Sequence, residues 1–106
     1  MFESKAKRYV TRGISERVPL HIQFLCWHLI DEAVKKKDTE IDYLQIFEFK
    51  RSSNQKKITV IHRQEQPEFK RNVEVAITSD LLGFKELKLW VIDDTTHQTM
   101  LLPEEY

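Results

Sequence analysis

The fold of this chain is decided by residues 19–36, which read PLHIQFLCWHLIDEAVKK. Pro19 suits the first turn of a helix, where a missing backbone N–H costs nothing. At about 100° per residue, one half of the helical cylinder is apolar and the other is polar. The apolar half contains Leu20, Ile22, Cys26, Trp27, Leu29, Ile30, Ala33 and Val34, and the polar half contains His21, His28, Asp31, Glu32 and Lys35. The pattern predicts an amphipathic helix from residue 19 to about residue 36, whose apolar face is covered.

Downstream of this helix the apolar period changes from about 3.6 residues to about 2, which is typical of strands. The sequence predicts strands at residues 43–50, 57–63 and 72–77, with a turn cluster at 52–55 and a connection at 64–67. Because the links are short, we expect these strands to pair antiparallel as a meander.

Both ends of the chain add elements. Residues 8–12 have strand-like composition that stops at Gly13, and residues 87–93 alternate as a further strand. Residues 78–83 contain a helix N-cap followed by an apolar pair and Gly83, which predicts one helical turn.

Residues 99–102, TMLL, are too apolar for a solvated tail. We hypothesise that they pair with the strand containing Trp90 and close a hairpin over residues 94–97. Pro103 would then end the ladder, because proline lacks a backbone donor. In the competing arrangement, the segment from Thr99 to Tyr106 stays mobile until a partner accepts it as an added strand.

These elements predict an α+β fold in the order β-α-β-β-β-β-β. The expected architecture is an antiparallel sheet of about five to six strands, with one long helix packed on one face. An antiparallel sheet needs only one face covered, and one long helix is sufficient for that. Because 106 residues are few for two domains, we expect residues 1–106 to form a single domain.

Composition favours a reducing compartment. Cys26 is the only cysteine, so an internal disulfide is impossible. No apolar leader opens the chain, and no stretch approaches the roughly 20 apolar residues that cross a bilayer. We therefore expect a cytoplasmic protein without membrane association.

Residues 1–17 are mainly basic and residues 86–106 mainly acidic, which predicts either two solvated ends near each other or a dipolar surface that orients a partner.

No combination of residues in the sequence is typical of a catalytic or metal site. His21 and His28 share a helix face but lie roughly 10 Å apart along the axis, too far to bind one ion together. Cys26 points to the apolar side, and His62 and His97 lie on or beside separate strands. With 2 glycines, the chain can form neither a dinucleotide fingerprint nor a P-loop. We therefore predict no catalytic residue, no metal, no cofactor and no enzymatic activity.

One alternative function is weak binding of single-stranded nucleic acid. Phe47 and Phe49 point to the same side of one predicted strand, and aromatic side chains on a sheet can stack bases. The turn that follows is basic, with Lys50, Arg51, Lys56 and Lys57. This binder would use the basic N-terminal arm and the turn near Arg51. The same aromatic pair is also expected on a strand under a helix, and the neutral net charge favours that core interpretation.

Two residues disturb the amphipathic helix. Phe24 and Leu25 border its polar face, beside His21 and His28. Because exposed apolar groups on a helix can mark a partner surface, we predict partner binding at these four residues. The favoured function is a non-enzymatic protein-binding module whose partner is another protein or a second copy of the chain.

Several short motifs resemble a known family. They are residues 8–13 (RYVTRG) leading into Val18-Pro19, Trp27 in the helix, residues 90–93 (WVID) and residues 99–106 (TMLLPEEY). In these motifs the chain resembles the bacterial domain-of-unknown-function family 960, found mainly among low-GC Gram-positive bacteria. The resemblance spans nearly the whole chain. It implies a bacterial cytoplasmic protein and supplies no site residues.

Overall fold

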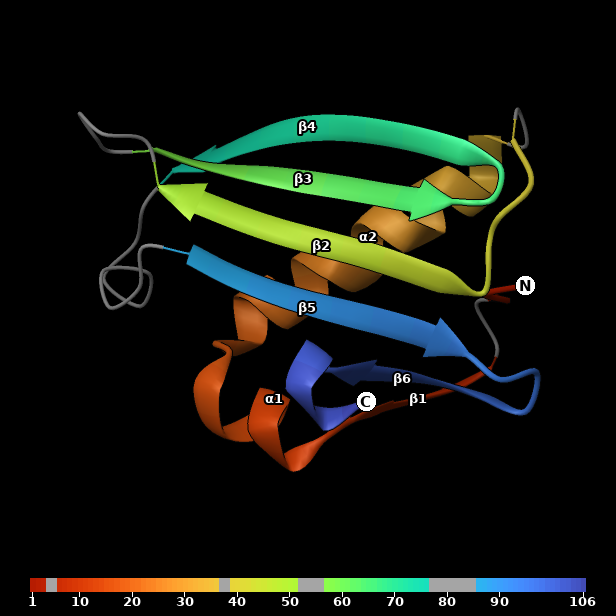
Figure 1. Cartoon of the computed structure of the whole chain (residues 1–106), viewed down its shortest axis with the longest axis horizontal. Coiled ribbons are helices and arrows are strands. Elements are labelled where there is room, and N and C mark those ends of the chain that lie inside the picture. The colour runs from red at the N-terminus through yellow and green to blue at the C-terminus, as the bar shows by residue number, and fades with distance from the viewer. Residues whose placement is uncertain (4–5, 37–38, 52–56, 77–85) are drawn as a thin grey trace.

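The computed structural model describes residues 1–3, 6–36, 39–51, 57–76 and 86–106 (Figure 1). Its helices are α1 (Arg12–Arg17) and α2 (Leu20–Lys36), and a 3₁₀ turn, η2, covers Pro103–Glu105. Its strands are β1 (Lys7–Val10), β2 (Leu44–Arg51), β3 (Lys57–Glu65), β4 (Glu68–Ala76), β5 (Glu86–Asp93) and β6 (His97–Leu101).

Within the described ranges, the strands form one six-stranded sheet in the order β1-β6-β5-β2-β3-β4. The long helix α2 crosses one face of this sheet, behind the strands in Figure 1. The predicted α+β class, with one long helix on one face of a sheet, is confirmed. Most neighbouring strands pair antiparallel, but β1 runs parallel to β6, so the expectation of a wholly antiparallel sheet was wrong at this edge.

The core lies between α2 and the covered face of the sheet. Alternate residues of the strands point inward because successive side chains of a strand face opposite sides. The buried sheet residues include Phe47, Phe49, Ile58, Val60, Leu89, Val91 and Met100, and α2 supplies Ile22, Cys26, Leu29 and Ile30. The apolar faces of the strands, with a period of 2, and of α2, with a period of 3.6, therefore pack against each other in one apolar layer.

Leu29 is 3% exposed at the centre of this layer. Replacing it with alanine should lower the free energy of unfolding by about 2–5 kcal/mol, because the substitution leaves a cavity in a packed core. Chemical denaturation of the two proteins measures the difference. A loss below about half a kcal/mol, the size of an ordinary surface substitution, would show that Leu29 does not pack in the core.

The N-terminal segment differs from the prediction. The expected strand over residues 8–12 ends at Val10, and Gly13 lies inside α1 instead of stopping the strand. Thr11 caps this short helix, because its Oγ1 accepts a hydrogen bond from the backbone N–H of Ile14 at 3.3 Å. Ile14 is fully buried, so the added helix covers part of the core.

The covered face of α2 is also shifted from the predicted one. Leu20 was assigned to the covered half but is 66% exposed, and Trp27 is only half-buried. Gln23 is 6% exposed instead, with its Nε2 donating to the carbonyl oxygen of Val18 at 2.9 Å. A buried amide is compatible with the covered face when it has a hydrogen-bond partner, as Gln23 does.

The middle strands are longer than predicted. Strand β4 begins at Glu68 rather than residue 72, because the β3–β4 hairpin is tight and pairs Glu65 with Glu68. The predicted turn cluster at 52–55, the end of the third strand at Ile77 and the helical turn at 78–83 lie outside the described residues.

The predicted C-terminal hairpin is confirmed. Strand β6 pairs antiparallel with β5, with Leu101 opposite Trp90 and Thr99 opposite Ile92. Met100, Leu101 and Leu102 are all buried. The segment therefore belongs to the sheet, and Tyr106 packs on Trp90 in an edge-to-face arrangement with ring centroids 5.6 Å apart.

The basic and acidic ends of the chain lie against each other. Arg17 pairs with Glu104 at 3.1 Å. The carboxylate of Glu105 accepts hydrogen bonds from Thr11 Oγ1 at 2.6 Å, Gly13 N at 3.0 Å and Leu102 N at 2.8 Å. A Cβ atom on Gly13 would lie 2.7 Å from this carboxyl group, so a larger residue at this position would displace the Glu105 side chain. The structure thus places the two charged ends of the chain next to each other.

The hydrogen bonds from Thr11, Leu102 and Gly13 hold the pKa of Glu105 below its ordinary value. A carboxyl group of this kind stabilises the fold above its unfolded-state pKa of 4.5, and the contribution is lost as pH falls through the folded pKa. We expect Glu105→Gln to lower the melting temperature at neutral pH and to reduce the loss of stability on acidification below pH 4.5. Thermal scans over a pH series test this. Glu104→Gln, which removes only an exposed ion pair, is the matched control; an equal response from both variants would contradict the role of Glu105.

Candidate functional site

The first turns of α2 carry the most exposed part of the predicted partner surface. Phe24 is 65% exposed, and Leu20, one turn earlier, is 66% exposed. Together with Pro19 and His21 they line a shallow hollow, which is adjoined by a second hollow lined in part by Val10 and Leu20. We call Val10, Pro19, Leu20, His21 and Phe24 the Leu20–Phe24 surface.

The four residues predicted from the sequence only partly lie in this surface. His21 and Phe24 belong to it, whereas Leu25 is half-buried and packs against the core. His28 is exposed but lies one turn further along α2, where its Nε2 is 3.2 Å from a carboxylate oxygen of Glu32. Leu20 was missed, because helical periodicity places it on the apolar half.

Strand β1 forms the open edge beside this surface. It pairs with β6 on one side and is the terminal strand of the described sheet. Tyr9 is 49% exposed and Val10 is 38% exposed. An edge strand presents unpaired backbone groups to other chains, so an apolar surface next to it can be extended by strand pairing.

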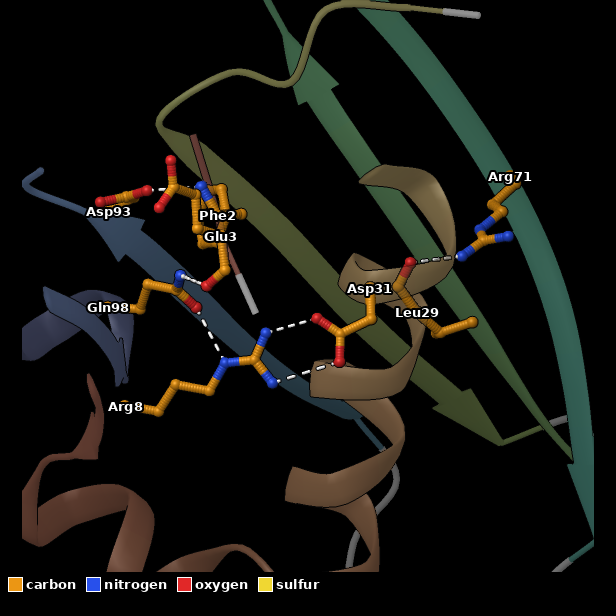
Figure 2. A network of polar contacts seen from close by, with 8 residues as sticks. All are labelled: Phe2, Glu3, Arg8, Leu29, Asp31, Arg71, Asp93 and Gln98. Carbon is orange, nitrogen blue, oxygen red and sulfur yellow. Dashed lines mark hydrogen bonds and ion pairs between the residues drawn. The ribbon is translucent and has the colours of Figure 1, made fainter. Parts of the chain in front are cut away.

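Arg8 connects β1 to α2 and β6 through hydrogen bonds (Figure 2). Its guanidinium binds the carboxylate of Asp31 on α2, and its Nε donates to Gln98 Oε1 at 2.9 Å. It also lies over the ring of Trp27, 4.6 Å from the centroid. Since every nitrogen of its guanidinium has a protein partner, Arg8 holds β1 in place and is not available to a ligand.

The same network continues to the N-terminal residues. Gln98 Nε2 donates to the carbonyl oxygen of Glu3 at 2.9 Å, and the backbone N–H of Phe2 donates to Asp93 (Figure 2). Phe2 is fully buried. These contacts hold the start of the chain against β5 and β6.

A buried polar cluster lies at the other end of the covered face. His62 stacks on Phe47 with ring centroids 4.4 Å apart, and its Nε2 lies 2.7 Å from Gln45 Oε1. Gln45 Nε2 donates to Gln64 Oε1 at 2.9 Å, so Gln45 Oε1 is the acceptor and His62 Nε2 carries the proton. Burial, and secondarily the positive charge of Arg71, lower the pKa of His62 to about 3. A histidine that is fully buried and neutral cannot deliver protons to a substrate at neutral pH.

Cys26 is chemically inert in this structure. It is fully buried, and burial raises the pKa of its thiol well above the ordinary value. A nucleophilic cysteine requires an accessible thiolate and a neighbouring base. The predicted inward orientation of Cys26 is confirmed.

A family model described as "Staphylococcal protein of unknown function (DUF960)" matches residues 7–105. The chain belongs to this family. The family resemblance inferred from the sequence motifs is therefore confirmed, and it assigns no activity.

A solved structure shares the fold of this DUF960 protein. It is the crystal structure of a protein of unknown function from Enterococcus faecalis, with a TM-score of 0.80 and 22% identity over 99% of this chain and 94% of that chain. At this identity the likeness shows the fold alone. No curated protein matches the chain.

The described part of the DUF960 chain shows neither a group of three or more potential metal ligands nor a helix that is long and apolar enough to span a membrane.

The aromatic pair that nucleic-acid binding would use lies in the core, since Phe47 and Phe49 are both fully buried. The arginines of the basic N-terminal arm already have carboxylate partners: Arg8 pairs with Asp31, Arg12 with Glu16 and Arg17 with Glu104. These positions therefore do not favour nucleic-acid binding.

Proposed function

We propose that this DUF960 protein is a non-enzymatic protein-binding module that contacts its partner through the Leu20–Phe24 surface. The observation that supports this function is the pair Leu20 and Phe24, each about two thirds exposed and one helical turn apart. Burying a large apolar side chain is worth about 1.5–3 kcal/mol, so a partner that covers both gains several kcal/mol. We further propose that residues 1–106 act as a single domain in the bacterial cytoplasm.

The neighbouring edge strand supports a protein rather than a small molecule as the partner. The hollows of the Leu20–Phe24 surface are shallow and open, whereas small-molecule sites are concave and enclose most of their ligand. A protein segment can combine apolar contacts to Phe24 with backbone hydrogen bonds to β1. Aromatic residues, phenylalanine among them, are also enriched in protein interfaces.

A comparative capture experiment tests this function. The wild-type chain, a Leu20→Ser/Phe24→Ser variant and a Tyr43→Ser control would each be immobilised and exposed to nuclease-treated extract of the host bacterium. Tyr43 is a suitable control because it is also an exposed aromatic residue, 48% accessible, and lies just before β2. We expect the same protein to be retained by the wild type and by the control, and lost with the double variant.

Sedimentation equilibrium of the purified chains tests the second possible partner, another copy of the chain. A dimer that dissociates only in the Leu20→Ser/Phe24→Ser variant would identify self-association as the use of this surface. Equal behaviour of the three chains in both experiments would contradict the proposed contact surface.

A further inference from the structure

A cavity of about 150 Å³ lies at the opposite end of α2, between the last turns of this helix, the segment that follows it and the start of β4. It is lined by Ala33, Lys36, Thr39, Ile41, Phe69 and Arg71. At about 1.5 Å per residue, Lys36 is roughly 24 Å along α2 from Leu20, so the cavity is separate from the Leu20–Phe24 surface.

Arg71 is one of the residues that line this cavity, and its guanidinium is incompletely hydrogen-bonded. Figure 2 shows it reaching from β4 to the carbonyl oxygen of Leu29 on α2, to which Nη2 donates at 2.7 Å. Its Nε is buried and has no hydrogen-bond partner among the residues that the structure describes. A buried N–H without an acceptor is costly, and the cost is greater for a charged group. The Arg71 side chain therefore has an unmet requirement for an acceptor.

No carboxylate among the described residues neutralises the positive charge at this cavity. The ion pairs of the described chain include neither Arg71 nor Lys36. The charge of Arg71 acts on its surroundings, since it contributes to the low pKa of the nearby His62. Most other arginines of the described chain have a carboxylate partner; Arg8, for example, is bound to Asp31.

We propose that this cavity binds a carboxylate carried by a short apolar group. The planar fork of Arg71 matches the two oxygens of a carboxylate, and Lys36 adds a second positive charge. Ala33, Ile41 and Phe69 form the apolar wall that receives the rest of the ligand. An apolar cavity of about 150 Å³ accommodates a molecule the size of benzene, which limits the apolar group to roughly that size.

Titration of the full chain with benzoate, followed by amide chemical shifts in two-dimensional NMR, tests this proposal. We expect saturable shifts at Lys36, Thr39, Phe69 and Arg71 with benzoate, and none with benzamide, which has the same shape without the charge. Arg71→Gln should weaken benzoate binding at least about tenfold, because it removes a charge-assisted bidentate contact. Lys70→Gln, an exposed neighbour on the same strand, should leave the affinity unchanged.

A second variant tests the proposal even if Arg71→Gln fails to fold. Lys36 is exposed at the end of α2, so Lys36→Gln should fold normally and weaken benzoate binding about threefold or more. Equal shifts with benzoate and benzamide, or unchanged affinity in the folded variants, would overturn the proposal.

The source of the carboxylate is distinguished by a further titration. A short peptide that ends in valine with a free carboxylate would be compared with the same peptide carrying a C-terminal amide. Tighter binding of the free-acid peptide than of benzoate assigns the cavity to a protein C-terminus, and binding of benzoate alone assigns it to a small carboxylic acid. Absence of binding by benzoate and by both peptides rejects the site, without affecting the protein contact proposed for the Leu20–Phe24 surface.

Discussion

Deleting residues 100–106 is expected to abolish the cooperative unfolding transition of the protein. The deletion removes Met100, Leu101 and Leu102, which are 0%, 6% and 3% exposed. At about 1.5–3 kcal/mol for each buried side chain, the lost burial is comparable to the whole stability of a small protein, about 5–15 kcal/mol. The deletion also removes the carbonyl oxygen of Met100, which accepts a hydrogen bond from Thr11 N at 3.0 Å.

Thermal unfolding followed by circular dichroism measures this effect. Deletion of residues 103–106 alone is the matched control, because it removes η2 and the largely exposed end while keeping β6 intact. We expect the control to retain a cooperative transition at a somewhat lower temperature, since the contacts of Glu105 are lost. If the chain without residues 100–106 melts at the wild-type temperature, the hairpin is dispensable in the free protein and the segment becomes a binding tail.

Acidification is expected to destabilise the protein through His62 before most carboxylates titrate. The pKa of His62 is lowered from 6.5 to about 3 by burial and by Arg71. Between these two pH values, the unfolded chain therefore binds a proton that the folded protein excludes. The free energy of unfolding therefore falls with falling pH, by about 1.4 kcal/mol per pH unit below pH 6.5 and by up to roughly 5 kcal/mol at pH 3.

Urea denaturation at a series of pH values tests the role of His62. His62→Gln keeps a donor for Gln45 Oε1 but cannot titrate, so its stability should be lower at neutral pH and nearly constant between pH 6.5 and pH 4.5. His28→Gln, at an exposed position, should retain the wild-type slope. An unchanged slope in His62→Gln would show that another group is responsible.

The helix and most strands could be predicted because their apolar periods are regular. Residues 20–36 keep one apolar half through several turns, and the alternation in β2, β3 and β5 is clear enough to locate these strands and the final hairpin. The buried cysteine and the inward Phe47 and Phe49 follow from the same patterns. Periodicity locates elements well when the covered face consists of apolar residues.

The rest was not predictable from local patterns. The parallel pairing of β1 with β6 joins residues about 90 positions apart and leaves no signal in either segment. The inward positions of Gln23, Gln45 and His62 are polar, and only the tertiary structure supplies their hydrogen-bond partners. Arg71 was missed for the same reason. The sequence does not show that its side chain reaches α2, and this contact follows only from the position of β4 beside α2.

The pairing of β1 with β6 has a consequence for how the protein is made. Within the described sheet, β1 pairs with β6 alone, and β6 is translated about 90 residues later, since Lys7 pairs with His97. At about 5–20 residues per second, β1 waits roughly 5–20 s for that partner. During this interval the β2–β3–β4 meander and α2 can already collapse, while the edge of β5 remains unprotected. Completion of the sheet must therefore follow translation of residues 97–101, and a nascent chain stalled before them would expose an unpaired strand to chaperones and to other chains.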